Sequence, residues 1–142
     1  MSKIASTYAQ ALFDAALESN VLEDIKNDFN VIRSVMKEQP QFMEILTLHK
    51  LDKNDKKELI KTIFSKDASQ ILVNFLMVLI DKDRINLLTE IMIAYNELVN
   101  QHFGILEGTV YSAVALSEGQ LTELTYAFTK KLNQKVKLNV EI

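Results

Sequence analysis

The sequence predicts a mainly α-helical protein, with a six-helix N-terminal bundle followed by a small β-α-β unit. Residues Ile71–Ile80 are apolar at nine of ten positions, so a helix here needs neighbours on nearly every side. Around this segment apolar residues recur at helical spacing, and the whole chain contains one proline and three glycines. The last eight residues instead alternate between polar and apolar, which is typical of a strand. The change of period separates a bundle, residues 1–104, from a C-terminal unit, residues 105–142.

Composition excludes several classes of function. The net charge of −3 argues against a dedicated nucleic-acid binder, which usually carries a basic surface. The chain has no cysteine, and therefore no disulfide or thiolate metal site. The Ile71–Ile80 run is about half as long as the ~20 residues needed to cross a bilayer. The segment Met1–Ala5 also lacks the apolar core of a signal peptide. We expect any membrane association to be indirect.

The first three helices follow from periodicity and from local start signals. Residues Ile4–Ser19 form the first, and its five alanines suit either tight packing inside the bundle or a docking face for another helix. Asn20 and Glu23 have the spacing of a capping box that opens the second helix. Pro40 fits the first turn of a short third helix.

The fourth helix is predicted over Lys53–Phe64, with Asp52 as its N-cap. Acidic residues are interspersed among its lysines, which favours a solvated face over a phosphate-binding or membrane-surface patch. These lysines are Lys53, Lys56, Lys57 and Lys61.

After the apolar fifth helix, Asp83 is expected to cap the longest helix, Arg84–Phe103, which Gly104 ends. Ile105–Ala115 then has the character of a strand. Ser117 and Gln120 form a second capping box, which opens another helix.

The final strand is predicted over Lys135–Ile142 and presents its apolar residues on one face: Val136, Leu138, Val140 and Ile142. A β-α-β unit of about 38 residues cannot bury both faces of its sheet. Either the chain is part of something longer, or a partner covers the open face. We therefore expect this unit to be less stable than the bundle.

The sequence offers no catalytic, cofactor or metal motif. His49 and His102 are the only histidines, and each falls on a different element. We interpret His102 as a surface residue at a helix C-terminus. Asp81 and Asp83 are better explained by a turn than by a metal pair, and no glycine spacing suits a phosphate loop. We predict a helical binding module that is not an enzyme and holds no cofactor.

Three segments, in this order, resemble the delta subunit family of the rotary proton-translocating ATP synthase. They are Tyr8–Phe13, the stretch from Asn74-Phe75-Leu76 to Asp83-Arg84-Ile85, and the region from Ser112 to Ile142. The most specific part is Ala115–Glu118, followed by Lys130–Leu132 and Lys135–Leu138. The family's mitochondrial members are the oligomycin-sensitivity-conferring proteins. The resemblance covers essentially the whole chain.

The resemblance implies a stator adaptor, peripheral on the cytoplasmic face of the bacterial membrane as part of the ATP synthase. In that family the helical domain binds the N-terminal helix of an alpha subunit on the catalytic head. The C-terminal domain meets the b subunits of the peripheral stalk, so the adaptor resists rotor torque. The family pattern continues past the last strand with a Gly-Gly turn, more strand and a terminal helix, whereas this sequence ends at Ile142.

The family's binding groove lies between its first and fifth helices. Its implied lining in this chain comes half from each helix: Tyr8, Ala11, Leu12, Ala15, Asn74, Phe75, Val78 and Leu79. These two helices are also the ones whose composition leaves apolar surface to spare. The alternative interpretation is an unrelated helical scaffold whose excess apolar surface is a homodimer interface.

Overall fold

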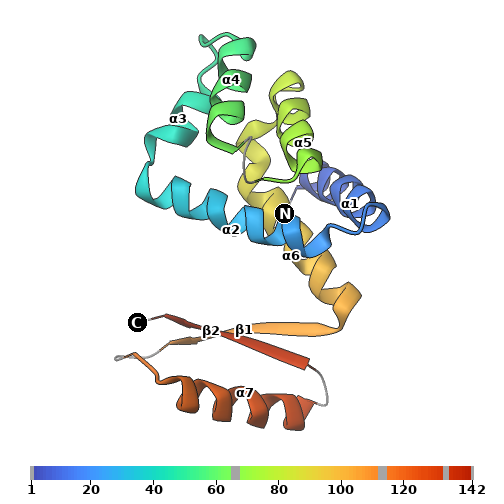
Figure 1. Cartoon of the computed structure of the whole chain (residues 1–142), viewed down its shortest axis with the longest axis vertical. Coiled ribbons are helices and arrows are strands. Elements are labelled where there is room, and N and C mark those ends of the chain that lie inside the picture. Colours follow the sequence, from blue (N-terminus) through green and yellow to red (C-terminus); the bar gives the residue numbers. More distant parts are fainter. Residues whose placement is uncertain (1, 65–67, 112–114, 133–134, 142) are drawn as a thin grey trace. The chain divides into compact units, whose positions relative to one another are not determined.

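The computed structural model describes residues 2–64, 68–111, 115–132 and 135–141, and it is mainly helical, as predicted. Two compact units, residues 1–96 and 97–142, are described here one at a time. Figure 1 shows the elements in chain order. They are α1 (Lys3–Glu18), α2 (Leu22–Glu38), α3 (Gln41–Thr47), α4 (Lys53–Phe64), α5 (Gln70–Asp81), the 3-10 turn η1 (Ile85–Leu87), α6 (Leu88–Phe103), β1 (Ile105–Tyr111), α7 (Glu118–Leu132) and β2 (Lys135–Glu141).

Helix α5 contributes heavily to the core of the first unit, but it is not enclosed on every side. Five of its residues are buried: Leu72, Val73, Leu76, Leu79 and Ile80. Asn74 is exposed, and Val78 keeps 44% of its surface in solvent. The expectation of neighbours on nearly every side was therefore too strong, because one face of α5 stays open.

Helices α2 and α6 pack through Tyr95. Its ring is fully buried and meets Phe29 edge-to-face, with ring centroids 5.2 Å apart. Its hydroxyl donates a 2.7 Å hydrogen bond to the backbone carbonyl of Leu22. Burial, reinforced by the carboxylates of Asp24 and Asp28, raises the pKa of Tyr95 well above its ordinary value. The phenol therefore stays protonated and acts as a structural donor between the two helices.

We expect Tyr95→Phe to destabilise the chain by about 1 kcal/mol, the net contribution of one buried hydrogen bond. The ring would still pack against Phe29, so the loss isolates the hydroxyl. Urea unfolding of both proteins, followed by circular dichroism, measures the difference. Equal unfolding midpoints would mean that the contact with Leu22 contributes nothing.

Two predicted helix starts proved to be helix ends. Asn20 and Asp83 both adopt left-handed backbone conformations, with φ of 63° and 56°. After α1, the Val21 amide donates to the Ala16 carbonyl at 2.9 Å and the Asn20 amide to the Leu17 carbonyl at 3.2 Å. This is the hydrogen-bond pattern of a Schellman motif. The capping box predicted from Asn20 and Glu23 is therefore wrong, and α2 begins after Val21 without a side-chain cap.

The same motif ends α5, where the Arg84 amide donates to the Leu79 carbonyl at 2.7 Å and the Asp83 amide to the Ile80 carbonyl at 3.2 Å. Asp83 therefore closes α5 instead of capping the next helix, which starts as η1 before continuing as α6. With 17 residues, α2 is longer than the 16-residue α6, contrary to expectation. The Asp52 cap is confirmed, since the Asn54 amide donates to its carboxylate at 2.7 Å.

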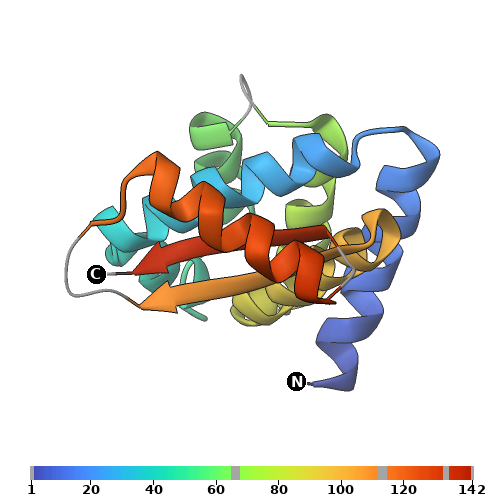
Figure 2. The same cartoon turned by 90° about the horizontal axis from the view of Figure 1, so that it is seen from below.

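In the second unit, β1 and β2 pair in parallel, from Ile105 opposite Lys135 to Tyr111 opposite Glu141. Both views show α7 lying along these strands (Figures 1 and 2). The capping box at its start is confirmed: the Gln120 amide donates to the Ser117 hydroxyl and the Ser117 amide donates to the Gln120 side chain. The predicted first strand continued through residues 112–114, which lie outside the described residues, as does Ile142 at the end of the second.

Val136 is buried, whereas no residue of α7 is buried. The lower stability expected of this unit stays a prediction.

Candidate functional site

Helices α1 and α5 lie side by side and meet through an aromatic pair. The rings of Tyr8 and Phe75 are in edge-to-face contact, with centroids 6.3 Å apart. Both residues are only partly buried. An edge-to-face pair of this kind adds favourable free energy to the contact between the two helices, beyond the contribution of its buried area.

Polar contacts fix the first turn of each of these helices. The Ser2 hydroxyl caps α1 by accepting from the Ala5 amide at 3.1 Å, and the Ser2 amide donates to the Glu90 carboxylate of α6 at 3.2 Å. At the start of α5, the Ser69 amide donates to the Asp28 carboxylate of α2 at 2.9 Å. Both helices are therefore positioned by other parts of the first unit.

Six of the eight predicted groove residues retain solvent-exposed surface. Ala11, Asn74 and Val78 are exposed, while Tyr8, Ala15 and Phe75 are of intermediate exposure. The Asn74 side-chain oxygen Oδ1 accepts a 2.8 Å hydrogen bond from the side-chain Nε2 of Gln70, one turn earlier on the same helix. These residues leave a partly apolar surface over the contact between α1 and α5.

The other two predicted residues lie beneath this surface. Leu12 keeps 2% of its surface exposed and Leu79 none. They hold α1 and α5 in the core and are not accessible to a partner in this structure. The family resemblance implied these two positions, but apolar residues of an amphipathic helix also face the core.

The eight groove residues implied by the family resemblance do not include two apolar residues that extend the same surface. Ile4, which is 43% exposed, lies one turn before Tyr8 on α1. Ile71, which is of intermediate exposure, lies one turn before Phe75 on α5. Both occupy i, i+4 positions relative to the aromatic pair, so this spacing could have identified them.

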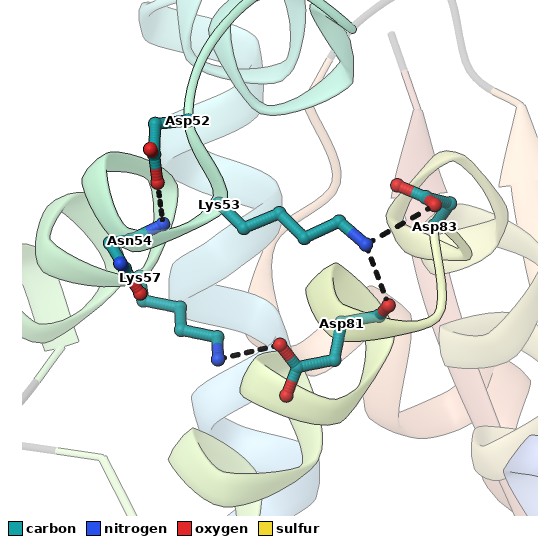
Figure 3. A network of polar contacts seen from close by, with 6 residues as sticks. All are labelled: Asp52, Lys53, Asn54, Lys57, Asp81 and Asp83. Atoms are coloured by element: carbon teal, nitrogen blue, oxygen red, sulfur yellow. Dashed lines mark hydrogen bonds and ion pairs between the residues drawn. The ribbon is translucent and has the colours of Figure 1, made fainter.

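The sequence predicted that the lysines of α4 form a solvated face. In the structure they do not all face solvent. Figure 3 shows Lys53 bonded to the turn after α5, with its Nζ 2.9 Å from the Asp81 carbonyl and 3.3 Å from the Asp83 carboxylate. The Lys57 Nζ lies 2.6 Å from the Asp81 carboxylate. Lys53 and Lys61 fit the prediction of a solvated face, since both stay exposed in their ion pairs, whereas Lys57 is only partly exposed. Lys53 and Lys57 therefore join α4 to the end of α5 through Asp81 and Asp83.

The fourth lysine departs furthest from that prediction. Lys56 is 6% exposed, although it lies between two lysines that reach carboxylates. Alternation of charge along the sequence cannot show which lysine faces the neighbouring helices.

No catalytic constellation emerges from the described residues. His49 lies in the first unit and His102 in the second, and both are exposed. Within the described parts of the chain, no cluster of three or more histidine, cysteine, aspartate or glutamate residues has the arrangement of a metal site. No helix among them is both long and apolar enough to cross a bilayer. Asp81 and Asp83 instead bind the α4 lysines.

Comparison with known proteins identifies the family of this chain. The family described as "ATP synthase delta (OSCP) subunit" matches residues 4–142. The chain belongs to the ATP synthase delta (OSCP) family. It is accordingly a non-catalytic stator component of the F-type ATP synthase. The family predicted from the three sequence segments is confirmed.

Relatives of this delta-family chain include the ATP synthase subunit delta of Clostridioides difficile, 37% identical over 94% of the chain and 74% of the relative. The subunit delta of Geobacillus sp. is 35% identical over 97% of the chain and 76% of the relative. A chain of the Toxoplasma gondii mitochondrial ATP synthase hexamer superposes with a TM-score of 0.81 at 16% identity, covering 99% of this chain and 78% of the other. That structural likeness concerns the fold alone.

Proposed function

We propose that this delta-family chain links the catalytic head of the ATP synthase to its peripheral stalk and resists rotor torque during proton-driven synthesis. Its helical bundle, residues 1–104, binds the N-terminal helix of an alpha subunit. Its β-α-β unit, residues 105–142, faces the b subunits of the stalk. The complex works at the cytoplasmic face of the bacterial membrane, and the chain's membrane association is indirect. Bacterial relatives of the same family support this assignment.

The observation that carries the head-binding half is the surface over α1 and α5. Ile4, Ala11 and Val78 leave apolar groups in water beside the Tyr8–Phe75 pair. An amphipathic helix recognises such a surface by inserting apolar residues at i, i+3, i+4 and i+7 positions. The small side chain of Ala11 lets the backbone of the partner helix come close to that of α1. Leu12 and Leu79 support this surface from below.

Reconstitution tests the adaptor role. Membranes carrying ATP synthase stripped of its delta subunit should regain proton-driven ATP synthesis when this chain is added. The isolated head should hydrolyse ATP at the same rate with or without the chain, because the chain contributes no catalytic residue. Restored synthesis supports the adaptor, whereas a chain that binds the head without restoring synthesis would contradict the linking role.

Light scattering separates the adaptor from a homodimeric scaffold. An adaptor whose apolar surface awaits an alpha-subunit helix should remain a monomer over a wide range of protein concentration. A mass that doubles with concentration, and a surface over α1 and α5 that is lost in the dimer, would favour self-association instead.

A further inference from the structure

A pocket in the first unit, away from the residues assigned to partner binding, is lined by a largely buried lysine that has no partner among the described residues. The pocket has a volume of about 170 Å³ and lies where α4, η1 and the segment after α3 meet. Lys56 is one of its lining residues and is only 6% exposed. Among the described residues, no hydrogen bond or ion pair is made by its ammonium, whereas Lys53, Lys57 and Lys61 each reach a carboxylate.

Most of Lys56 is buried, and a lysine in this position is less favourable when no group of opposite charge meets its ammonium. One explanation is that the aliphatic stem of Lys56 packs in the core while its ammonium stays hydrated in the pocket. However, the pocket is larger than one water requires, since a water needs about 10–15 Å³ of such volume. Its lining residues also include His49 and Asn86, whose side chains can donate hydrogen bonds.

Charge selects the class of ligand. Asp83 is another lining residue, but its carboxylate is already paired with Lys53 at 3.3 Å. The charge of Lys56 is therefore left in excess, which suits a group with one negative charge. A dianion such as phosphate would meet Asp83 with a second, unmatched charge. A carboxylate can accept from the ammonium, the imidazole and the amide together.

We infer that this pocket binds a single carboxylate group through Lys56, with His49 and Asn86 as supporting donors. The carboxylate belongs either to a small organic acid or to an aspartate or glutamate side chain of another protein. This site is independent of the surface over α1 and α5, so its test does not depend on the proposed head binding.

The test is a titration of the whole chain with sodium acetate, with sodium chloride exchanged to hold the ionic strength constant. Side-chain nuclear magnetic resonance follows the two histidine rings and the lysine ammonium groups. We expect saturable shifts at His49 and none at His102, which lies in the other unit. Shifts that stay linear, or that appear equally at both histidines, would overturn the inference.

Matched lysine variants assign the binding to one residue. Lys56→Met keeps an unbranched apolar stem and should weaken acetate binding at least about tenfold, the effect of one lost charge-assisted hydrogen bond. Lys61→Met removes an exposed lysine from the same helix and should leave binding unchanged. Equal binding by the Lys56→Met protein would show that Lys56 is only a packed stem with a hydrated ammonium. If that variant did not fold, saturation at His49 in the parent would still decide whether the site exists.

Two further ligands test the chemistry and its source. Sodium phosphate should bind more weakly than acetate, and tighter phosphate binding would overturn the carboxylate assignment. N-acetyl-glutamate amide carries one carboxylate on a protein-like side chain. Tighter binding of this compound than of acetate would identify a protein side chain as the source, and the reverse order would identify a free acid.

Discussion

Replacing Ala11 with aspartate is expected to weaken binding of the alpha-subunit N-terminal peptide by about a hundredfold or more while the chain stays folded. Ala11 is exposed in the free chain, so the new carboxylate is hydrated there and the helix tolerates it. Docking would remove that water without supplying a counter-charge, which costs several kcal/mol. Each ~1.4 kcal/mol corresponds to a tenfold change in affinity. Calorimetric titration of both proteins measures the difference.

Ala127→Asp is the matched control, because it introduces the same charge at an exposed alanine of α7 in the other unit. It should bind the peptide as tightly as the parent does. If the Ala11→Asp protein bound the peptide as tightly as the parent, the peptide would not bind on the surface over α1 and α5. An unfolded Ala11→Asp protein would instead show that Ala11 is needed for packing inside the bundle.

The largest effect on stability is expected from Leu76→Ala in α5. Leu76 is completely buried, and removing a buried leucine side chain leaves a cavity that typically costs about 2–5 kcal/mol. Val78→Ala, two residues later on the same helix, is the control. Its side chain is 44% exposed, so the loss should stay below about 1 kcal/mol. Urea unfolding measures both, and similar losses would show that α5 does not distinguish a core face from an open one.

Periodicity predicted the elements well and their junctions poorly. Helix α4 has its predicted bounds and α5 extends one residue further at each end, because apolar spacing reports which residues must be buried. Asn20 and Asp83 were assigned to the wrong helix, since asparagine and aspartate suit both an N-cap and a left-handed C-terminal position. In the structure, both residues take the left-handed conformation that ends the preceding helix, α1 or α5.

The candidate surface was predictable in outline but not in depth. The family resemblance implied α1 and α5, and their apolar composition agreed, yet Leu12 and Leu79 belong to the core beneath the surface. A sequence period gives the direction of a side chain but not what covers it. The lysines of α4 illustrate the same limit, because only tertiary packing separates the buried Lys56 from the carboxylate-bound Lys57.

The most direct measurement of head binding is methyl nuclear magnetic resonance during titration with the alpha-subunit N-terminal peptide. The methyl signals of Ala11, Ala15 and Val78 should shift and saturate together at one peptide per chain. Those of Val31, a valine of α2 that is 54% exposed, should not move. If the peptide shifted Val31 while Ala11 and Val78 stayed unchanged, the peptide would bind elsewhere and the surface over α1 and α5 would not be the head-binding site.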